Sequence, residues 1–357
     1  MIDVLIVGGG PAGLATAIRC ALAGLSVTVA EPRASPVDKA CGEGVMPAAV
    51  RRLTALGVKP DGYPLRGIRY VDAAHQADAR FRHGDGLGVR RTVLHAALAA
   101  RAAALGIPVV AARVTDFERH PGHVTAAGIE ARYLVAADGL HSTIRRFLER
   151  DADPAVRPGP GARQQAPPRY GLRRHFRVAP WTDLVEVHWT PQAEAYVTPV
   201  SPDVVGVALL FARHGARDDP GGDFKARLSA FAALSGRLDG AAPASDVRGA
   251  GPLRHDVRRR VYGRVLLVGD ASGYVDALTG EGLGVGLAQA EALAACLAAD
   301  RPADYERAWR RASGPAWRFT AGLLWSRNQP LLGPRLVPFA QHFPWVFSTL
   351  VNHVAQA

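Results

Sequence analysis

Residues 1–31 read MIDVLIVGGGPAGLATAIRCALAGLSVTVAE, and this stretch decides the fold. An apolar run at 2–7, of strand length and rich in β-branched residues, leads directly into a G-x-G-x-x-G turn. A helical pattern follows from Leu14, and 25–30 reads as a second strand that ends at Glu31, where a carboxylate can accept a ribose hydroxyl. This order predicts a βαβ unit that binds a dinucleotide, whereas an ordinary glycine turn would not require strand, helix and acid in sequence.

Each glycine of the turn has a separate physical task. Gly8 allows the tight turn, Gly10 lets the backbone approach a pyrophosphate, and Gly13 lets the helix pack closely on the strand. Pro11 and Ala12 lie at the start of the helix, where unpaired N–H groups and the positive end of the helix dipole attract phosphate.

The composition is that of an ordinary globular protein with an unusual charge. The 357 residues are 48% hydrophobic and 21% charged, which is enough for one composite domain or two interleaved ones. The formal charge is +11, and only Lys39, Lys59 and Lys225 are lysines, so the bias toward arginine indicates compositional drift. The charge still attracts phosphorylated cofactors and anionic membrane surfaces. No basic stripe with interleaved aromatics occurs, so we expect no nucleic-acid partner.

The cysteines and the first residues predict a cytoplasmic protein. Cys20, Cys41 and Cys296 cannot form a paired disulfide framework, and Cys20 and Cys296 lie in apolar helical stretches typical of a core. The chain starts directly on a strand, without a charged leader or an apolar signal segment. Reducing cytosol is the compartment that this pattern favours. We predict no metal site.

The segment 39–47 reads KACGEGVMP and places Cys41 beside two glycines, Gly42 and Gly44, that flank Glu43. Such a pattern indicates backbone that lies close to a ligand. The alternative is a flexible connector.

A second informative segment covers residues 134–145. An apolar strand ends at Asp138-Gly139, Ser142 is placed to cap the next helix, and Arg145 lies in its first turn. A carboxylate and an arginine are therefore expected near the carboxyl end of a strand, where open α/β sheets bind ligands.

A third segment begins with the apolar run 264–268. It leads to Gly269-Asp270, then to a glycine-rich loop with Gly280, Glu281, Gly282 and Leu283, and then to an alanine-rich helix ending near residue 299. Strand, Gly-Asp, glycine-rich loop and helix in this order are more specific than any glycine pair alone.

The remaining chain predicts a second lobe. Residues 62–83 read as strands, 88–106 as a helix, 170–211 as alternating strands without a helix, 224–238 as one helix, and 151–168 as a proline-rich linker. The predicted dinucleotide-binding domain comprises 1–60, 85–150 and 255–300, the substrate-binding sheet lobe 61–84 and 151–254, and the helical C-terminal segment 301–357.

The last fifty-odd residues are rich in aromatic side chains: Trp309, Trp317, Phe319, Trp325, Phe339, Phe343, Trp345 and Phe347. Prolines at 330, 334, 338 and 344 forbid an unbroken spanning helix. One interpretation is a helical tail that covers the substrate lobe. The other is an apolar mouth or membrane-surface patch for a lipophilic substrate.

Taken together, the three glycine-bearing segments resemble the flavoprotein superfamily that includes para-hydroxybenzoate hydroxylase and the geranylgeranyl reductases. The resemblance runs from Ile2 to about Ala299 and implies a three-layer ββα Rossmann-like FAD-binding α/β fold with an inserted antiparallel-sheet substrate lobe and a helical C-terminal tail. It implies FAD as the cofactor. Because only one G-x-G-x-x-G is present, NAD(P)H is expected to dock transiently as reductant. The residues expected to contact FAD are Gly8, Gly10, Pro11, Ala12, Gly13, Glu31, Arg33, Gly42, Arg91, Asp138, Gly139, Gly269, Asp270, Gly280, Gly282 and Leu283.

Two local matches point to the geranylgeranyl-reductase branch and one feature points away from it. The run 39–42 resembles the reductases' cysteine-glycine element, and 278–283 resembles their T-G-E-G loop. Their aromatic Tyr-x-Trp-x-Phe-Pro stretch is replaced here by 194–199, EAYVTP, so a different pocket is expected. The Trp-x-Trp-x-Ile-Pro of flavin halogenases is absent as well.

The resemblance therefore implies an FAD-dependent enzyme with two alternative reactions. The first is a monooxygenase that hydroxylates an apolar aromatic or polyketide-like molecule through a flavin hydroperoxide. The second is a reductase of an alkene in an isoprenoid or other lipophilic substrate, with Cys41 as proton donor. A non-catalytic flavin-binding protein is a third reading. Cys41 and Glu281 are the predicted catalytic residues, although Cys41 can also be a small residue packed beside the ring and Glu281 a structural carboxylate. We expect a lipophilic small-molecule substrate, a monomer or homodimer, and peripheral membrane contact through the aromatic C-terminal segment.

Overall fold

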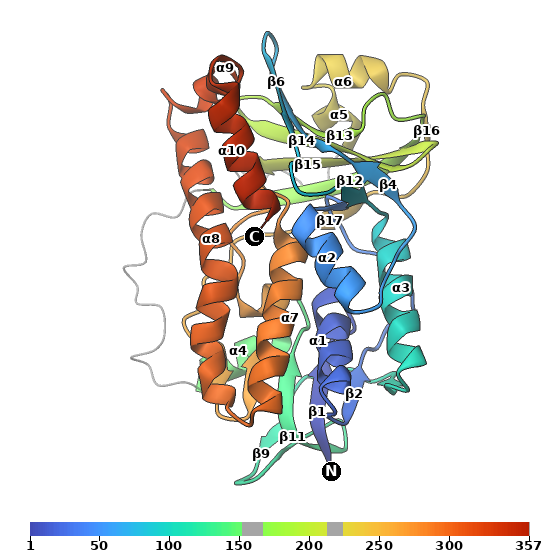
Figure 1. Ribbon diagram of the computed structural model, residues 1–357, viewed down its shortest axis with the longest axis vertical. Coiled ribbons are helices and arrows are strands. Elements are labelled where there is room, and N and C mark those ends of the chain that lie inside the picture. Colours follow the sequence, from blue (N-terminus) through green and yellow to red (C-terminus); the bar gives the residue numbers. More distant parts are fainter. Residues whose placement is uncertain (152–166, 213–223, 357) are drawn as a thin grey trace.

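Two lobes, each built on its own β-sheet, lie one above the other along the long axis of the molecule (Figure 1). The computed structural model describes residues 1–151, 167–212 and 224–356. Most of the predicted linker at 151–168 lies outside these residues. The boundaries given above for the three predicted domains remain predictions.

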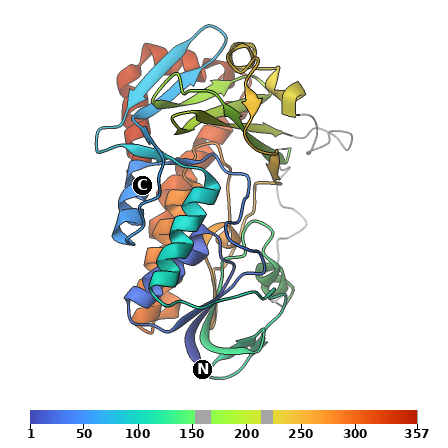
Figure 2. The ribbon, with the colours of Figure 1, turned by 90° about the vertical axis from the view of Figure 1, so that its right-hand side faces the viewer.

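The lower lobe is a largely parallel sheet. In spatial order its strands are β18 (Val261–Tyr262), β19 (Val265–Leu267), β11 (Ile129–Ala136), β1 (Ile2–Val7), β2 (Val27–Ala30) and β8 (Val109–Val110), with β10 (Val124–Ala126) paired to β11 and β9 (Glu118–Arg119) paired to β10. Strands β19, β11, β1, β2 and β8 run parallel, so the predicted βαβ unit is confirmed. Their carboxyl ends share the edge that faces the upper lobe (Figure 2).

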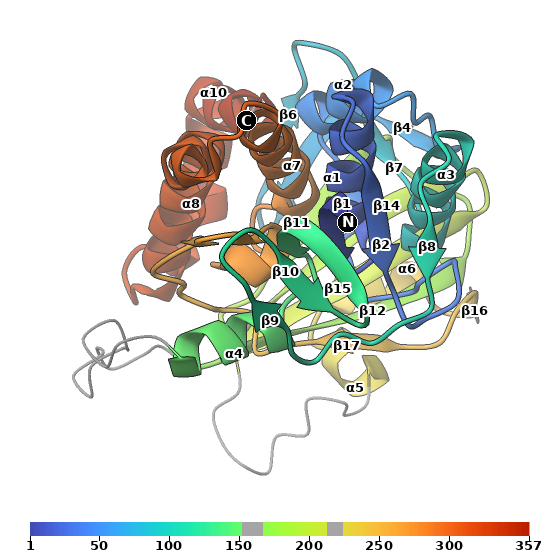
Figure 3. The same cartoon turned by 90° about the horizontal axis from the view of Figure 1, so that it is seen from below.

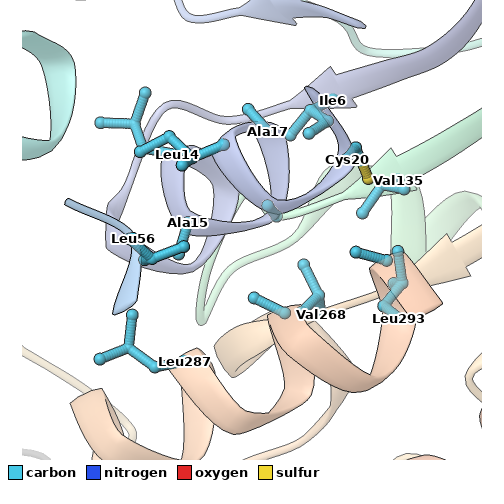
Figure 4. Close-up of a cluster of buried hydrophobic side chains, with 14 of the residues drawn as sticks. Ile6, Leu14, Ala15, Ala17, Cys20, Leu56, Val135, Val268, Leu287 and Leu293 are labelled. Carbon is cyan, nitrogen blue, oxygen red and sulfur yellow. The ribbon is translucent and has the colours of Figure 1, made fainter. Parts of the chain in front are cut away.

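The lower sheet is covered on both faces, which gives the expected three layers. On one face lie α1 (Pro11–Leu22), α3 (Arg91–Ala104) and α7 (Gly282–Ala298), and on the other lie β9, β10 and α4 (Thr143–Asp151). Strand β1 is apolar from Val4 to Val7 because Val4 and Ile6 pack toward the helices while Leu5 and Val7 pack toward the other layer. Cys20 is buried in the helix-side core, as predicted (Figure 4).

The upper lobe is a second twisted sheet. Its order is β16 (Ala242–Pro243), β12 (Arg169–Arg177), β15 (Val204–Ala212), β14 (Ala193–Ser201), β13 (Leu184–Trp189), β5 (Gly67–Val71) and β6 (Gln76–Arg80), with β17 (Arg248–Ala250) also paired to β12. Neighbours are antiparallel except β13 and β5, which run parallel. The inserted sheet is therefore confirmed, with one parallel pair at the point where the 67–80 hairpin joins it.

The helix predicted over 224–238 is two short helices. These are α5 (Phe224–Leu228) and α6 (Ala232–Arg237), and the backbone of Phe231 between them leaves the helical region at φ −112° and ψ 74°. Leu228, Phe231 and Leu234 still pack on the same sheet face. The helical spacing of the apolar side chains is therefore kept across 224–238, although the helix itself is interrupted at Phe231.

A small third sheet and one helix connect the two lobes. The sheet consists of β3 (Gly44–Val45), β7 (Gly86–Gly88) and β4 (Tyr63–Leu65), and α2 (Pro47–Ala55) follows β3. A side chain at Gly88 would bring its Cβ to 1.7 Å from the carbonyl oxygen of Pro199. The strand crosses under β14 so closely that only glycine fits there.

The C-terminal segment is helical, as predicted, and covers the end of the upper sheet. It comprises α8 (Tyr305–Asn328), α9 (Leu336–His342) and α10 (Pro344–Ala355). Seen from below, α7 lies between α8 and α1 (Figure 3). Leu324, Val337 and Phe347 pack against Ile68 and Val187 of the upper sheet. Among the described residues, no helix combines the length and the apolar character needed to cross a membrane.

Candidate functional site

A cavity of about 450 Å³ runs from the carboxyl edge of the lower sheet into the upper lobe. Of the residues predicted to contact FAD, its walls include Gly10, Pro11, Ala12, Gly42, Arg91, Gly139, Gly269, Asp270, Gly280, Gly282 and Leu283, together with Cys41. These residues come from segments far apart in the chain. The parallel topology brings them to one edge.

The N-termini of two helices lie at this cavity, and neither is capped by a side chain. Helix α1 begins after Gly10 and α7 begins after Glu281, and neither N-cap residue makes a side-chain capping bond. Their first N–H groups and positive dipole ends are therefore available to an anionic ligand. Gly13 does not line the cavity. A Cβ on it would lie 1.9 Å from the Gly8 carbonyl oxygen, so this glycine allows the close helix–strand packing that holds the α1 terminus in place.

Glu31 lies at the end of β2, but its carboxylate is already engaged. Its oxygens accept hydrogen bonds from the Gly9 N–H at 2.9 Å and from the Arg33 side chain at 2.7 Å and 2.9 Å. Burial raises the pKa of Glu31, but the bonds from Arg33 and Gly9 outweigh this effect, so the pKa lies below its ordinary value. A ribose hydroxyl can reach this carboxylate by sharing it with Arg33 or by displacing that half-exposed side chain.

Arg91, Asp270 and Lys39 form a charged group on the lower cavity wall. Among the described residues, none of these three side chains has a hydrogen-bond partner in the protein. Burial raises the pKa of Asp270, with Lys39 and Arg91 opposing that shift, and burial lowers the pKa of Lys39. Sequence reasoning missed Lys39. Its signal was that it is one of three lysines and directly precedes the Cys41 segment.

Asp138 lies just after β11, at the strand end where it was expected, but its side chain has a capping role that the sequence did not predict. Its Oδ2 accepts hydrogen bonds from the backbone N–H groups of Thr143 at 2.7 Å and Ile144 at 3.3 Å, so it caps α4. It does not line the cavity, whereas Gly139 beside it does. Arg145 bonds the carbonyl oxygens of Leu140 and Ala271 and thereby fixes this corner to the Gly269 loop.

Cys41 lines the cavity on a loop that buried hydrogen bonds hold in place. Its Sγ accepts a hydrogen bond from the Glu43 N–H at 3.4 Å, and burial raises the pKa of the thiol. Glu43 has φ +60°, a conformation rare for non-glycine residues. Its Oε1 accepts the Arg91 N–H at 2.8 Å and its Oε2 lies 2.6 Å from His175 Nε2. The flexible-connector interpretation is therefore wrong.

The same buried network reaches into the upper sheet. His175 Nδ1 lies 2.8 Å from the Ser245 hydroxyl, and Arg173 bonds Asp38 and the Lys39 carbonyl oxygen. Arg173 also lines the cavity. The sequence did not predict this network, because strand β12 and the 38–43 loop are far apart in the chain.

Glu281 points away from the large cavity. It lines a separate cavity of about 40 Å³ behind the α7 N-terminus, beside Tyr274 and Trp317. Among the described residues, neither carboxylate oxygen has a hydrogen-bond partner. Burial raises its pKa from 4.5 to about 7. This position does not favour direct contact with a substrate in the large cavity.

Replacing Glu281 by glutamine is expected to stabilise the FAD-free protein at alkaline pH. Between pH 4.5 and about 7 the unfolded chain loses the Glu281 proton while the folded chain keeps it, so the free energy of unfolding falls as pH rises. Above pH 7, Glu281→Gln should raise that free energy by about 3 kcal/mol, and below pH 4.5 the two proteins should coincide. Urea unfolding across this range measures it. Glu291→Gln, an exposed carboxyl on the same helix, is the control, and an equal response in both variants would contradict the prediction.

The upper end of the cavity is apolar. Its walls there include Ile68, Tyr70, Val187, Tyr196, Leu210, Leu253, Phe319, Leu323, Phe347 and Val351. The Tyr196 hydroxyl donates to the Leu278 carbonyl oxygen at 2.5 Å, which removes its donor from the cavity. Of the charged side chains on the described cavity wall, Lys39, Arg91 and Asp270 belong to the lower end, and Glu43 and Arg173 lie where the 38–43 loop meets β12. The geometry suits a ligand with a charged dinucleotide at one end and an apolar molecule at the other.

A buried charge cluster, here called the clamp, fixes the upper lobe to the cofactor loop and to α8. It consists of Arg169, Glu194, Asp276 and Arg327. Arg169 bonds Glu194 at 2.6 Å and Asp276 at 2.9 Å, and Arg327 also bonds Glu194. The clamp joins β12, β14, the loop before α7 and the C-terminal helix.

Comparison with known proteins agrees with this geometry. Residues 1–156 match the FAD binding domain family. The chain is 31% identical over 315 residues to a dialkyldecalin synthase of Streptomyces rugosporus, which covers 83% of this chain and 65% of that protein. It is 28% identical to a digeranylgeranylglycerophospholipid reductase of Methanothrix thermoacetophila, over 87% of this chain and 84% of that protein.

A solved structure shares the whole fold. The OxyS anhydrotetracycline hydroxylase from Streptomyces rimosus superposes with a TM-score of 0.72 and 25% identity, over 99% of this chain and 75% of that one. The described architecture is therefore not specific to one of the reactions named for these relatives.

Proposed function

Because this chain belongs to the superfamily of FAD-dependent oxidoreductases that includes para-hydroxybenzoate hydroxylase and the geranylgeranyl reductases, we propose that it holds FAD and acts on a lipophilic small molecule. The observation that carries the proposal is the chemistry of the two ends of the large cavity. One end has uncapped helix N-termini and unpartnered charged side chains, and the other end is apolar. The chain spans 65% of the synthase it resembles, so activity and substrate are proposals.

The lower cavity residues fit FAD. The α1 N-terminus and Gly10 would receive the pyrophosphate and Asp270 the ribityl chain. Glu31, which lies outside the cavity wall and accepts the Gly9 N–H, would receive the adenosine ribose. The α7 N-terminus would face the edge of the flavin ring that gains negative charge on reduction. Bound FAD would supply hydride and oxygen chemistry that no side chain of the protein can perform.

The first candidate reaction is hydroxylation of an apolar molecule. Apolar walls exclude water, and exclusion of water protects a reactive oxygen donor from unproductive decay. The hydroxylase with a similar structure supports this candidate.

The second candidate reaction is reduction of an alkene, which the position of Cys41 favours. Its Sγ lines the cavity, and its raised pKa keeps the thiol protonated near neutral pH, as a proton donor requires. The reductase that this chain resembles over most of both lengths supports this candidate. We propose NAD(P)H as the reductant in either case, and a cytoplasmic location because the three cysteines are free thiols.

The test of the proposal has two steps. The purified chain is first titrated with FAD, and failure to take up the cofactor would overturn the proposal. A panel of lipophilic aromatic and unsaturated compounds is then incubated with NAD(P)H under labelled oxygen and without oxygen. Label in the product assigns hydroxylation, and anaerobic product with two added hydrogens assigns alkene reduction. A product isomeric with its substrate, formed without flavin reduction, would contradict both reactions and fit a synthase. No turnover across the panel would indicate a non-catalytic flavin-binding protein.

Replacing Cys41 by alanine separates the two reactions. If Cys41 donates the proton to an alkene, Cys41→Ala should lower product formation roughly a hundredfold or more, because general acid catalysis contributes that much. The rate of flavin reduction by NAD(P)H should not change. If the reaction is hydroxylation, product formation should change little.

The control for this experiment is Cys296→Ser, which removes a thiol that does not line the cavity. Stopped-flow absorbance measures flavin reduction, and mass spectrometry measures product. Equal losses of flavin reduction and of product formation in Cys41→Ala would indicate a packing role beside the ring instead.

A further inference from the structure

Large exposed apolar side chains gather on the C-terminal helices. Of the twelve in the described residues, seven lie between 325 and 350, and these define the apolar face: Trp325, Leu331, Leu332, Phe339, Phe343, Trp345 and Leu350. Trp345 is 69% exposed and Leu331 is 73% exposed. The end of α8, the turn after it, α9 and α10 lie together at the upper end of the molecule (Figure 1). An apolar face of this kind usually marks an interaction site.

The apolar face borders the cavity at two residues. Phe339 and Leu350 are both exposed to solvent and part of the cavity wall. The opposite sides of the same helices pack on the upper sheet through Val337, Ala340 and Phe347. The helices therefore have one apolar side in the core and a second apolar side exposed to solvent, which meets the cavity wall at Phe339 and Leu350.

The charged side chains of the C-terminal segment itself have one sign. From Arg307 to the end of the described chain there is no Asp or Glu, while arginines recur at 310, 311, 318, 327 and 335. Arg327 is held inside by Glu194, but Arg318 and Arg335 are exposed. Trp325 and Trp345 have the amphipathic rings that favour the boundary between lipid and water. An anionic lipid surface complements both the arginines and the exposed rings.

We infer that the apolar face docks on an anionic lipid surface, with the cavity wall at Phe339 and Leu350 directed at the acyl chains. The docking itself depends only on the apolar face and its arginines. The consequence that substrate enters from the lipid rests on the proposed function. No helix among the described residues can span the membrane, so the contact is peripheral.

The test uses the full FAD-loaded chain with vesicles of phosphatidylcholine and with vesicles that also contain phosphatidylglycerol. The protein is expected to bind the vesicles that contain phosphatidylglycerol, and its tryptophan emission should shift to shorter wavelength on binding. Added salt should weaken this binding roughly fivefold for each arginine contact that it screens. The double variant Trp325→Ser with Trp345→Ser should bind these vesicles more weakly. Each indole ring that is removed should cost roughly ten- to a hundredfold in affinity, because its burial in the lipid is lost. Co-sedimentation and fluorescence measure both results.

The matched control is Leu22→Ser with Val109→Ser, two exposed apolar residues of the lower lobe, which should leave vesicle binding unchanged. Absence of binding by the natural sequence, or equal loss in both double variants, would overturn the inference. A stable dimer that only the tryptophan variant dissociates would assign the face to a second copy instead. FAD uptake and turnover of detergent-dispersed substrate should persist in the tryptophan variant, so a failed inference leaves the proposed function standing. Failed FAD uptake by the natural sequence would remove that function without affecting the docking.

Discussion

Replacing Gly10 by alanine is expected to weaken FAD binding by roughly tenfold to a hundredfold, because an added methyl group overpacks a closely fitted site. The new Cβ would meet only the Arg91 side chain, at 3.7 Å, and would project toward the cavity. The backbone at Gly10 is extended, with φ −69° and ψ 176°, a conformation that alanine adopts freely. The free energy of unfolding of the FAD-free protein should therefore hardly change.

The contrast with Gly13→Ala makes this prediction specific. The Gly13 Cβ would lie 1.9 Å from the Gly8 carbonyl oxygen, so the helix must move away from the strand, which should cost about 3 kcal/mol of stability before any cofactor binds. Urea unfolding of FAD-free protein and absorbance titration with FAD distinguish the two variants. Gly122→Ala, which has no neighbour within 4 Å, is the control. Unchanged FAD affinity in Gly10→Ala would show that the pyrophosphate does not pass this turn.

Replacing Glu194 by alanine is expected to destabilise the protein by about 3–5 kcal/mol, because removing one partner of a buried ion pair leaves uncompensated charge. Glu194 is fully buried and accepts hydrogen bonds from Arg169 and Arg327. Without it, Asp276 at 2.9 Å is the sole carboxylate left in the clamp. The loop before α7 and the C-terminal helices should loosen together, because the clamp joins them.

A charge-balanced variant tests whether unpaired charge is the cause. Glu194→Gln combined with Arg327→Met removes one charge of each sign and keeps Arg169 paired with Asp276. It should therefore recover more than half of the free energy of unfolding that Glu194→Ala loses. Arg254→Ala, which breaks an exposed pair with Asp256, should leave the unfolding midpoint unchanged. If Glu194→Ala were as stable as Arg254→Ala, the clamp would make no net contribution to the stability of the folded protein.

The sequence by itself determined the parts of the protein that are local. Strand β1, its glycine turn, α1 and β2 follow one another within thirty-one residues, and the period of apolar side chains and the glycines specify each element. The same holds for the strand, Gly269-Asp270 and helix of the third segment. The expected α/β fold and the resemblance to FAD-dependent oxidoreductases rested on these segments and are confirmed.

Only the tertiary structure decided which side chains meet. Glu43 pairs with His175, and Glu194 with Arg169 and Arg327, across separations that no local pattern spans. The side-chain direction at a given position was also undetermined, because packing chooses it. Asp138 turned to cap α4 and Glu281 to a small separate cavity, while Lys39, which was not among the predicted site residues, reached the cavity wall. Periodicity encodes the elements that a segment forms, whereas a contact depends on how distant elements dock.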